Sequence, residues 1–147
     1  MKLVSMCLCG VNCNYKGQNK SHEKVEKMIR NGEAIPVCPE QLGGLPTPRE
    51  PAEVEGGSGK KVLDGKRKVN TKDGEDVTEQ FIKGAEEVLK IAEKLDIEEF
   101  IGKARSPSCG SRKTYNGSFS NTLVKGNGVT TALLKKNRIK VRSEEEL

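Results

Sequence analysis

Short apolar runs alternate with longer amphipathic segments along most of this chain. Runs of strand length lie at residues 2–9, 34–38, 99–104 and 139–141, and apolar side chains recur at helical spacing over 20–31, 76–95 and 128–136. Strands that alternate with helices favour a parallel sheet covered by helices. We therefore expect an α/β fold: one compact domain over residues 1–147, with a small, mainly parallel, Rossmann-like sheet flanked by helices.

The ends of several elements can also be predicted. Ser21 can cap the helix at 20–31, and Asp76 or Thr78 can cap the helix at 76–95. Pro36 favours a strand at the edge of the sheet. Residues 39–71 are rich in glycine, proline and charge, and we expect an exposed hairpin or flexible loop at 55–68, with a β-like patch at 61–63.

Composition limits the classes of function. No apolar run approaches the roughly 18 residues of a membrane span, and cysteine comes too early for a secretory signal, so we expect a soluble, cytoplasmic protein. The 26 Lys and Arg exceed the 21 Asp and Glu by 5, which favours an anionic partner such as a nucleotide or RNA. Two Tyr, three Phe and no Trp are too few to stack several bases in a row.

The five cysteines indicate metal binding or catalysis, because a reducing compartment disfavours disulfides. Cys7, Cys38 and Cys109 each lie at or just past the end of an expected strand, where α/β sheets bind ligands. Convergent thiolates without a neighbouring histidine suit a soft metal or an iron–sulfur cluster. The spacing matches neither a ferredoxin nor a zinc ribbon, so buried packing residues are the alternative. Cys9 alternates with Cys7 along the expected strand and should pack on the other side, and His22 should lie on a solvated helix.

Two rigid segments beside these cysteines carry candidate reactive groups. Glu40 belongs to Cys38-Pro39-Glu40, which a glycine- and proline-rich stretch follows up to Pro51. Ser106 and Ser108 belong to Ser106-Pro107-Ser108-Cys109-Gly110. Prolines fix the backbone and glycines allow close approach, so such segments hold a carboxylate or hydroxyl in place. Ordinary rigid turns are the alternative interpretation.

Four segments resemble, in order, the motifs of the thiouracil desulfidase family. They are CLCGVNCNYKG at 7–17, VCPE with GGLPTPR at 37–49, KARSPSCG with YNGSF at 103–119, and GNGVT with ALL at 126–134. The resemblance runs nearly end to end. Three residues depart from the first motif: Cys9 replaces the usual leucine, and Asn14 and Lys16 replace the usual arginine and aspartate.

The resemblance implies a [4Fe–4S] cluster held by only three cysteines. The matching positions are Cys7, Cys38 and Cys109, with Cys13 as the rival ligand. The fourth iron would be open, and an open iron is a Lewis acid for a soft thiocarbonyl sulfur.

The same resemblance implies the reaction. Glu40 would activate water as a general base, and Ser106 or Ser108 would relay a proton, with Ser106 favoured by the family. We expect non-redox desulfidation of 4-thiouracil, or more favourably 4-thio-UMP, to the oxo form with release of hydrosulfide.

Contacts to the substrate are expected from cations and rings. Cations near the expected site suit a 5′-phosphate, and they are Arg49, Lys103, Arg105, Arg112 and Lys113. A ring that stacks on the base would come from Tyr15, Tyr115 or Phe119.

Three other functions stay open at this point. They are an iron–sulfur or sulfur-carrier module that does not need Glu40, a desulfidase acting on thiouridine in tRNA, and a structural zinc protein. No appended RNA-binding domain is visible, so we do not expect tRNA as the substrate. No membrane partner is expected, and a homodimer is left open.

Overall fold

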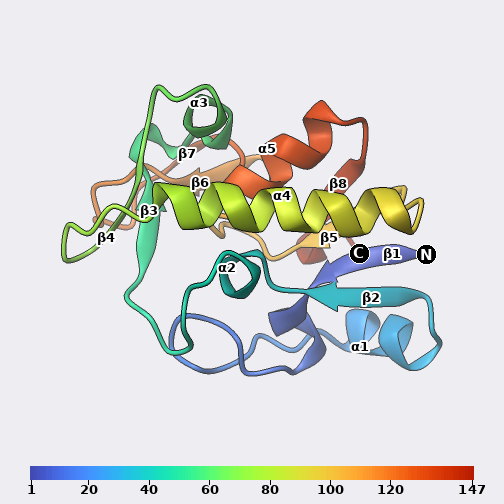
Figure 1. The fold of residues 1–147 in the computed structure, drawn as a ribbon. Helices are drawn as coiled ribbons and strands as arrows, with labels where there is room; N and C mark the ends of the chain where they lie inside the picture. The colour runs from blue at the N-terminus through green and yellow to red at the C-terminus, as the bar shows by residue number, and fades with distance from the viewer.

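Four parallel strands form the central sheet, in the order β2-β1-β5-β8 (Figure 1). They span Lys2–Ser5 (β1), Ala34–Val37 (β2), Glu99–Gly102 (β5) and Lys140–Ser143 (β8). The computed structural model describes residues 1–147 and confirms the expected α/β domain with a parallel sheet. Strand β2 lies at an edge, the position in which a sheet tolerates Pro36.

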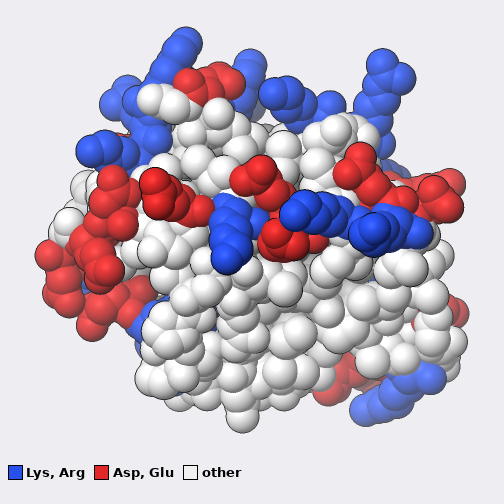
Figure 2. All heavy atoms as spheres, in the orientation of Figure 1, with Lys and Arg blue, Asp and Glu red and all other residues white.

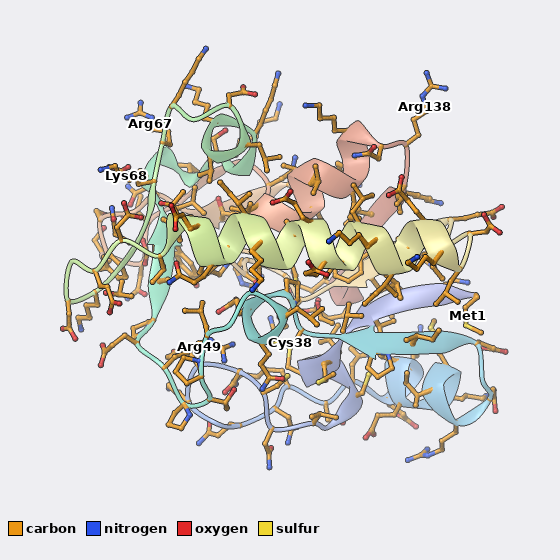
Figure 3. The ribbon with its side chains drawn as sticks, in the orientation of Figure 1. Met1, Cys38, Arg49, Arg67, Lys68 and Arg138 are labelled. Carbon is orange, nitrogen blue, oxygen red and sulfur yellow. The ribbon has the colours of Figure 1, made fainter.

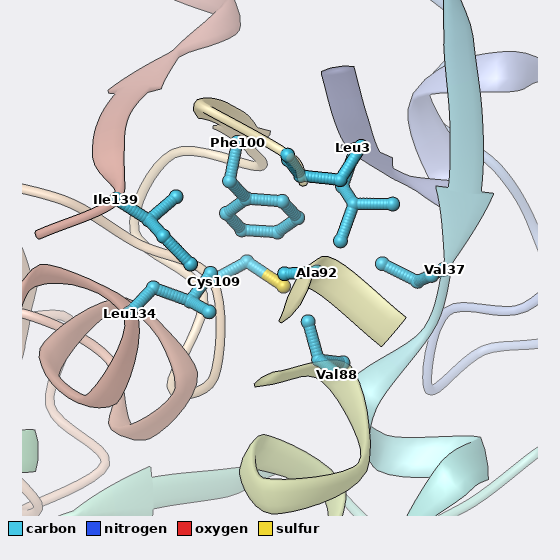
Figure 4. Close-up of a cluster of buried hydrophobic side chains, with 9 residues drawn as sticks. Leu3, Val37, Val88, Ala92, Phe100, Cys109, Leu134 and Ile139 are labelled. Carbon is cyan, nitrogen blue, oxygen red and sulfur yellow. The ribbon is translucent and has the colours of Figure 1, made fainter. Parts of the chain in front are cut away.

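Helices cover both faces of this sheet. Helices α4 (Thr78–Lys94) and α5 (Val129–Lys136) pack over one face, where Leu3 and Phe100 contribute to the largest apolar cluster (Figure 4). Helix α1 (Glu23–Arg30) packs against Val4 and Ile101 through Val25. Side chains alternate between the two faces of a strand, so Leu3 and Val4 pack on opposite faces of the sheet, as do Phe100 and Ile101. None of the helices has both the length and the apolarity to cross a membrane.

A group of shorter elements packs beside α4 and α5. Strand β3 (Ala52–Val54) pairs antiparallel with β4 (Val69–Thr71), and β6 (Lys113–Tyr115) pairs antiparallel with β7 (Leu123–Lys125). Helix α3 (Gly59–Leu63) contacts α5. The remaining short elements are α2 (Pro39–Leu42) and three 3₁₀ turns, η1 (Met6–Cys9), η2 (Glu55–Gly57) and η3 (Glu144–Glu146).

The predicted first strand is too long. It ends at Ser5, and η1 follows, closed by Gly10 at a φ of 83°. Cys7 and Cys9 therefore lie in a 3₁₀ turn, and the alternation of a strand does not relate them. Helix α1 begins at Glu23 after His22, which is half-buried rather than part of a solvated helix, and Ser21 does not cap it.

Two further predictions can be compared with the structure, the hairpin or loop at 55–68 and the cap of the helix at 76–95. Residues 55–68 contain η2 and α3 instead of a hairpin, and the expected β-like patch at 61–63 is part of α3. Val62 is buried there against Val54 and Val69. Helix α4 has Val77 rather than Asp76 or Thr78 as its N-cap residue, and Val77 makes no side-chain capping bond. The hydroxyl and the backbone N–H of Thr78 donate to the carboxylate of Asp76, and these hydrogen bonds lower the pKa of Asp76.

Helix α2 crosses α4 at two glycines. A Cβ atom on Gly84 would overlap the carbonyl oxygen of Pro39, and one on Gly43 would overlap the carbonyl oxygen of Gln80. The two backbones touch because neither position has a side chain. This crossing fixes α2, which directly follows β2 and Cys38.

Replacement of Gly84 by alanine should destabilise the protein by about 1–3 kcal/mol, because the new methyl group presses on the backbone of α2. The higher helix propensity of alanine than of glycine offsets about 1 kcal/mol of this loss of stability. Urea unfolding measures the difference, with Lys83→Ala at the neighbouring exposed position as the control. A Gly84→Ala protein that is more stable than the wild type would contradict the crossing.

Candidate functional site

The carboxyl ends of β1, β2 and β5 bring four cysteines together. Cys7 lies in η1 after β1, Cys38 directly follows β2, and Cys109 lies in the loop after β5. Cys13, from the loop after η1, lies beside Cys7 and Cys38, whose side chains shift the pKa of its thiol. The Cys38 thiol also donates to the carbonyl oxygen of Cys13 at 3.9 Å. The structure thus adds Cys13 to the three cysteines that the strand ends predict. Figure 3 shows Cys38 and Arg49 beside α2.

Cys9 faces a different neighbourhood. Its thiol donates to the carbonyl oxygen of Ser5 at 3.9 Å, and it packs against the apolar cluster of Val4 and Val25. Burial and the nearby Glu26 carboxylate raise the pKa of Cys9 to about 11. This placement fits a packing role, although the turn η1 rather than a strand produces it.

The thiols of Cys13, Cys38 and Cys109 are neutral at pH 7 in the absence of a metal. Burial raises the pKa of Cys109 to about 12, against hydrogen bonds with Ser5 and Ser108 that lower it. For Cys13, the hydrogen bond with Cys38 lowers the pKa, but the hydrogen bond with Cys7 and burial raise it more, to about 11. The hydrogen bond with Cys13 and burial raise the pKa of Cys38 further still. Because metals bind thiolates, loading this site would release protons.

Glu40 is held at both carboxylate oxygens. It lies in the first turn of α2, and Arg49 Nε donates to its Oε1 at 2.9 Å. The hydroxyl of Ser108 donates to its Oε2 at 2.8 Å. Arg49, 9 residues further along the chain, and Ser108, 68 residues further along, therefore fix a carboxylate that lies two residues after Cys38.

Hydrogen bonds within the protein occupy most of the donor groups of the Arg49 side chain. Its side chain is only 8% exposed, and its remaining bonds go to the hydroxyl of Thr47 and to the carbonyl oxygens of Pro46 and Cys13. Four of the five guanidinium N–H groups are thus engaged. A position that the sequence predicts as a phosphate contact is here bound to Glu40 and to the loop of Cys13.

The two predicted serines form a hydrogen-bonded chain that ends on Glu40. Ser106 Oγ accepts from the backbone N–H groups of Ser108 at 3.2 Å and Cys109 at 3.0 Å, and lies 3.1 Å from Ser108 Oγ. Ser108 Oγ in turn donates to Glu40 and lies 3.6 Å from Cys109 Sγ. Ser108 is buried and Ser106 is half-buried, so Ser106 is the more accessible end.

Three predicted substrate cations are paired with consecutive glutamates of η3. The N···O distances are 3.2 Å for Lys103–Glu144, 3.0 Å for Arg105–Glu145 and 2.8 Å for Arg112–Glu146. The first pair is largely buried and the other two are solvent-exposed.

The remaining residues that we predicted to contact the substrate differ in their exposure to solvent. Lys113 is exposed at the start of β6, and Tyr15 is exposed with Lys16 Nζ 5.7 Å from its ring centroid. Tyr115, at the end of β6, and Phe119 are half-buried. In the view of Figure 2, uncharged atoms cover most of the lower part of the molecule around α2, and Lys and Arg gather along the upper edge near α3 and α5. The excess of positive charge is therefore not concentrated over α2 in this view.

Sequence reasoning missed Ser5 and the glutamates of η3. Ser5 is buried at the end of β1, where its Oγ accepts from the backbone N–H of Lys103 at 2.9 Å and its side chain helps to lower the pKa of Cys109. A polar residue at the carboxyl end of an apolar strand is the one local signal that could have identified it. A run of three glutamates gives no sign of which cations it will meet.

The donor set fits an iron–sulfur cluster. No three His, Cys, Asp or Glu side chains are arranged to hold a single metal ion. A cluster, however, distributes its thiolates over separate iron atoms, and soft thiolates suit iron–sulfur centres. Four thiols of this kind lie at the site, and the one carboxylate beside them is already held by Arg49 and Ser108.

Comparisons with known proteins agree with this donor set. A family model described as 2-thiouracil desulfurase matches residues 3–146. The uncharacterized protein YbbK of Bacillus subtilis (strain 168) is 48% identical over 147 residues, which cover 100% of this chain and 97% of that protein. A solved structure of the [4Fe-4S]-dependent thiouracil desulfidase TudS is 41% identical, with a TM-score of 0.87 over 99% of this chain and 91% of that one. The chain therefore belongs to the 2-thiouracil desulfurase family.

Proposed function

We propose that this protein removes sulfur from a thiolated uracil at a [4Fe–4S] cluster, giving the oxo pyrimidine and hydrosulfide. The observation that carries the proposal is the Glu40 carboxylate, held by Arg49 and Ser108 beside the grouped cysteines. Membership of the 2-thiouracil desulfurase family supports the substrate class, and the similarity to TudS supports the cofactor.

Cys7, Cys38 and Cys109 would hold the cluster, since they come from the loops that follow three neighbouring strands. When bound, the cluster would supply a Lewis acid for the thiocarbonyl sulfur of the substrate. A sulfur carrier would need the same thiols, but it would have no use for a carboxylate fixed among them. We therefore favour the enzyme over the carrier.

Glu40 is the general base of this proposal. It would take a proton from the water that attacks the carbon bonded to sulfur. Arg49 holds Oε1 and thereby keeps the carboxylate in one orientation. Preorganised groups of this kind act without the cost of rearrangement during the reaction.

The serines would carry the proton from Glu40 to the departing sulfur or to the pyrimidine ring. Ser106 Oγ accepts two backbone N–H groups, and since the hydrogen of Ser108 goes to Glu40, the hydrogen of Ser106 is donated to Ser108 Oγ until a substrate takes its place. Ser108 joins Ser106 to Glu40, and the three groups form a relay. The direct contact with Glu40 makes Ser108 a member of the relay, and the accessible position of Ser106 makes it the end that meets the substrate.

We further propose the nucleotide 4-thio-UMP as the preferred substrate. Arg105 and Arg112 lie in the segment that carries Ser106, Ser108 and Cys109, and their pairs with Glu145 and Glu146 are solvent-exposed. Exposed pairs of this kind contribute about 0–1 kcal/mol, so a doubly charged phosphate can replace the glutamates. Arg49 is excluded from this role by its four hydrogen bonds, and the exposed ring of Tyr15 is available to stack on the base.

Substitution of Glu40 by glutamine should lower kcat by about 10²–10⁴-fold, because the amide cannot accept the proton of water. The protein is loaded anaerobically with iron and sulfide, and hydrosulfide release from 4-thiouracil and 4-thio-UMP is measured. Glu50→Gln, at an exposed glutamate of the same segment, is the matched control. Full activity of a loaded Glu40→Gln protein would rule out the general base, and a loaded wild type that releases no hydrosulfide would overturn the proposed function.

Replacement of Arg105 by glutamine should lower kcat/KM for 4-thio-UMP by about 10–100-fold, the value of a lost hydrogen bond between charged groups, and leave 4-thiouracil nearly unchanged. Increasing salt should also weaken the nucleotide reaction more than that of the free base. Lys94→Gln, at an exposed lysine at the end of α4, controls for net charge. Equal losses for base and nucleotide would contradict a phosphate contact.

A further inference from the structure

Cys13 lies deeper in the site than a three-cysteine cluster requires. Its side chain is 2% exposed, the thiol of Cys38 donates to its carbonyl oxygen at 3.9 Å, and the side chains of Cys7 and Cys38 are near enough to shift the pKa of its thiol. The molecule therefore offers four thiols at a site for which the proposed reaction leaves one iron without a protein ligand.

The backbone holds Cys13 in this position. Arg49 Nη2 donates to the carbonyl oxygen of Cys13 at 2.9 Å, and the backbone N–H of Arg49 donates to the carbonyl oxygen of Tyr15 at 2.8 Å. Asn14 closes the adjoining turn, since its Oδ1 accepts from the backbone N–H groups of Lys16 and Gln18. The loop is thus fixed by contacts with the residue that also holds Glu40.

Apolar packing does not account for this buried thiol. Cys109 belongs to the large cluster under α4 and α5, and Cys7 and Cys9 pack against the cluster under α1. Cys13 and Cys38 belong to none of the three apolar clusters. Grouped cysteine thiolates suit a soft metal or an iron–sulfur centre, and Cys13 is buried beside two of the proposed ligands.

We propose that Cys13 is a fourth, exchangeable ligand, whose thiolate binds the open iron when no substrate is present and is displaced by the sulfur of the substrate. This inference rests on the proposed cluster-dependent function. The exchange moves no electrons: Cys13 loses its thiol proton when it binds iron and regains a proton when the substrate sulfur replaces it. The resting enzyme would then protect the iron at which the reaction takes place.

The test uses the tendency of a [4Fe–4S] cluster with one iron lacking a protein ligand to lose that iron on mild oxidation, which leaves a paramagnetic [3Fe–4S] cluster. Wild type, Cys13→Ala, Cys13→Ser and Cys9→Ala are loaded anaerobically and treated with one equivalent of ferricyanide. The [3Fe–4S] signal is measured by electron paramagnetic resonance, and released iron is measured with a chelator. Cys9→Ala is the matched control because Cys9 lies in the neighbouring turn but faces Ser5.

We expect Cys13→Ala to give a several-fold larger [3Fe–4S] signal and iron release than wild type and Cys9→Ala, with Cys13→Ser between them. Excess 4-thiouracil should lower the signal of Cys13→Ala towards that of wild type, because the sulfur of the substrate then occupies the iron that lacks a protein ligand. Equal signals from wild type and Cys13→Ala would overturn the proposal, as would a Cys13→Ala protein that retains no cluster, which would make Cys13 a permanent ligand.

The outcome does not depend on turnover. A loaded wild type that is inactive, yet more resistant to oxidation than Cys13→Ala, would refute the proposed reaction and support the ligand. Failure of every variant, wild type included, to take up iron would overturn both proposals.

Discussion

Every reactive group of the site reaches its place because β1 runs parallel to both β2 and β5. Parallel strands end at one edge, so loops that are distant in sequence meet where the strands stop. Ser5 shows how close this meeting is, because its hydroxyl accepts from the backbone N–H of Lys103, 98 residues further along the chain. An antiparallel arrangement would send these loops to opposite ends of the sheet.

Charges around this edge fall into two kinds. Glu40 and Arg49 are 14% and 8% exposed, and a buried pair of this sort costs about 3–5 kcal/mol to break by removal of one partner, because the other charge is left without compensation. The pairs Arg105–Glu145 and Arg112–Glu146 are open to water and exchange their partners at little cost. The first kind keeps a carboxylate in place, and the second kind is suited to a ligand that comes and goes.

The sequence was informative wherever a pattern depends on neighbouring residues. Apolar runs and helical spacing predicted the sheet and α4, and cysteines at strand ends predicted three of the four grouped thiols. Turn η1 was missed because its residues are as apolar as those of β1, and α3 was missed because Val62 is its one buried large apolar side chain. The contacts of Arg49 with Cys13 and of Arg105 with Glu145 join residues 36 and 40 positions apart, and nothing local records them. The roles of Glu40 and the serines came from the family resemblance, and their mutual hydrogen bonds came from the structure.

The crossing of α2 and α4 ties a helix without reactive groups to the chemistry. At Gly43 and Gly84 two bare backbones meet, and no side chain is present that could readjust if one of them shifted. A change in α4 would therefore be transmitted to α2 as a displacement of Glu40 relative to the cysteines. In a mutational scan scored by turnover, Gly84 would behave like a residue of the active centre although it never meets the substrate. Selection for activity would thus act on the outer layer of the fold as well as on the edge of the sheet.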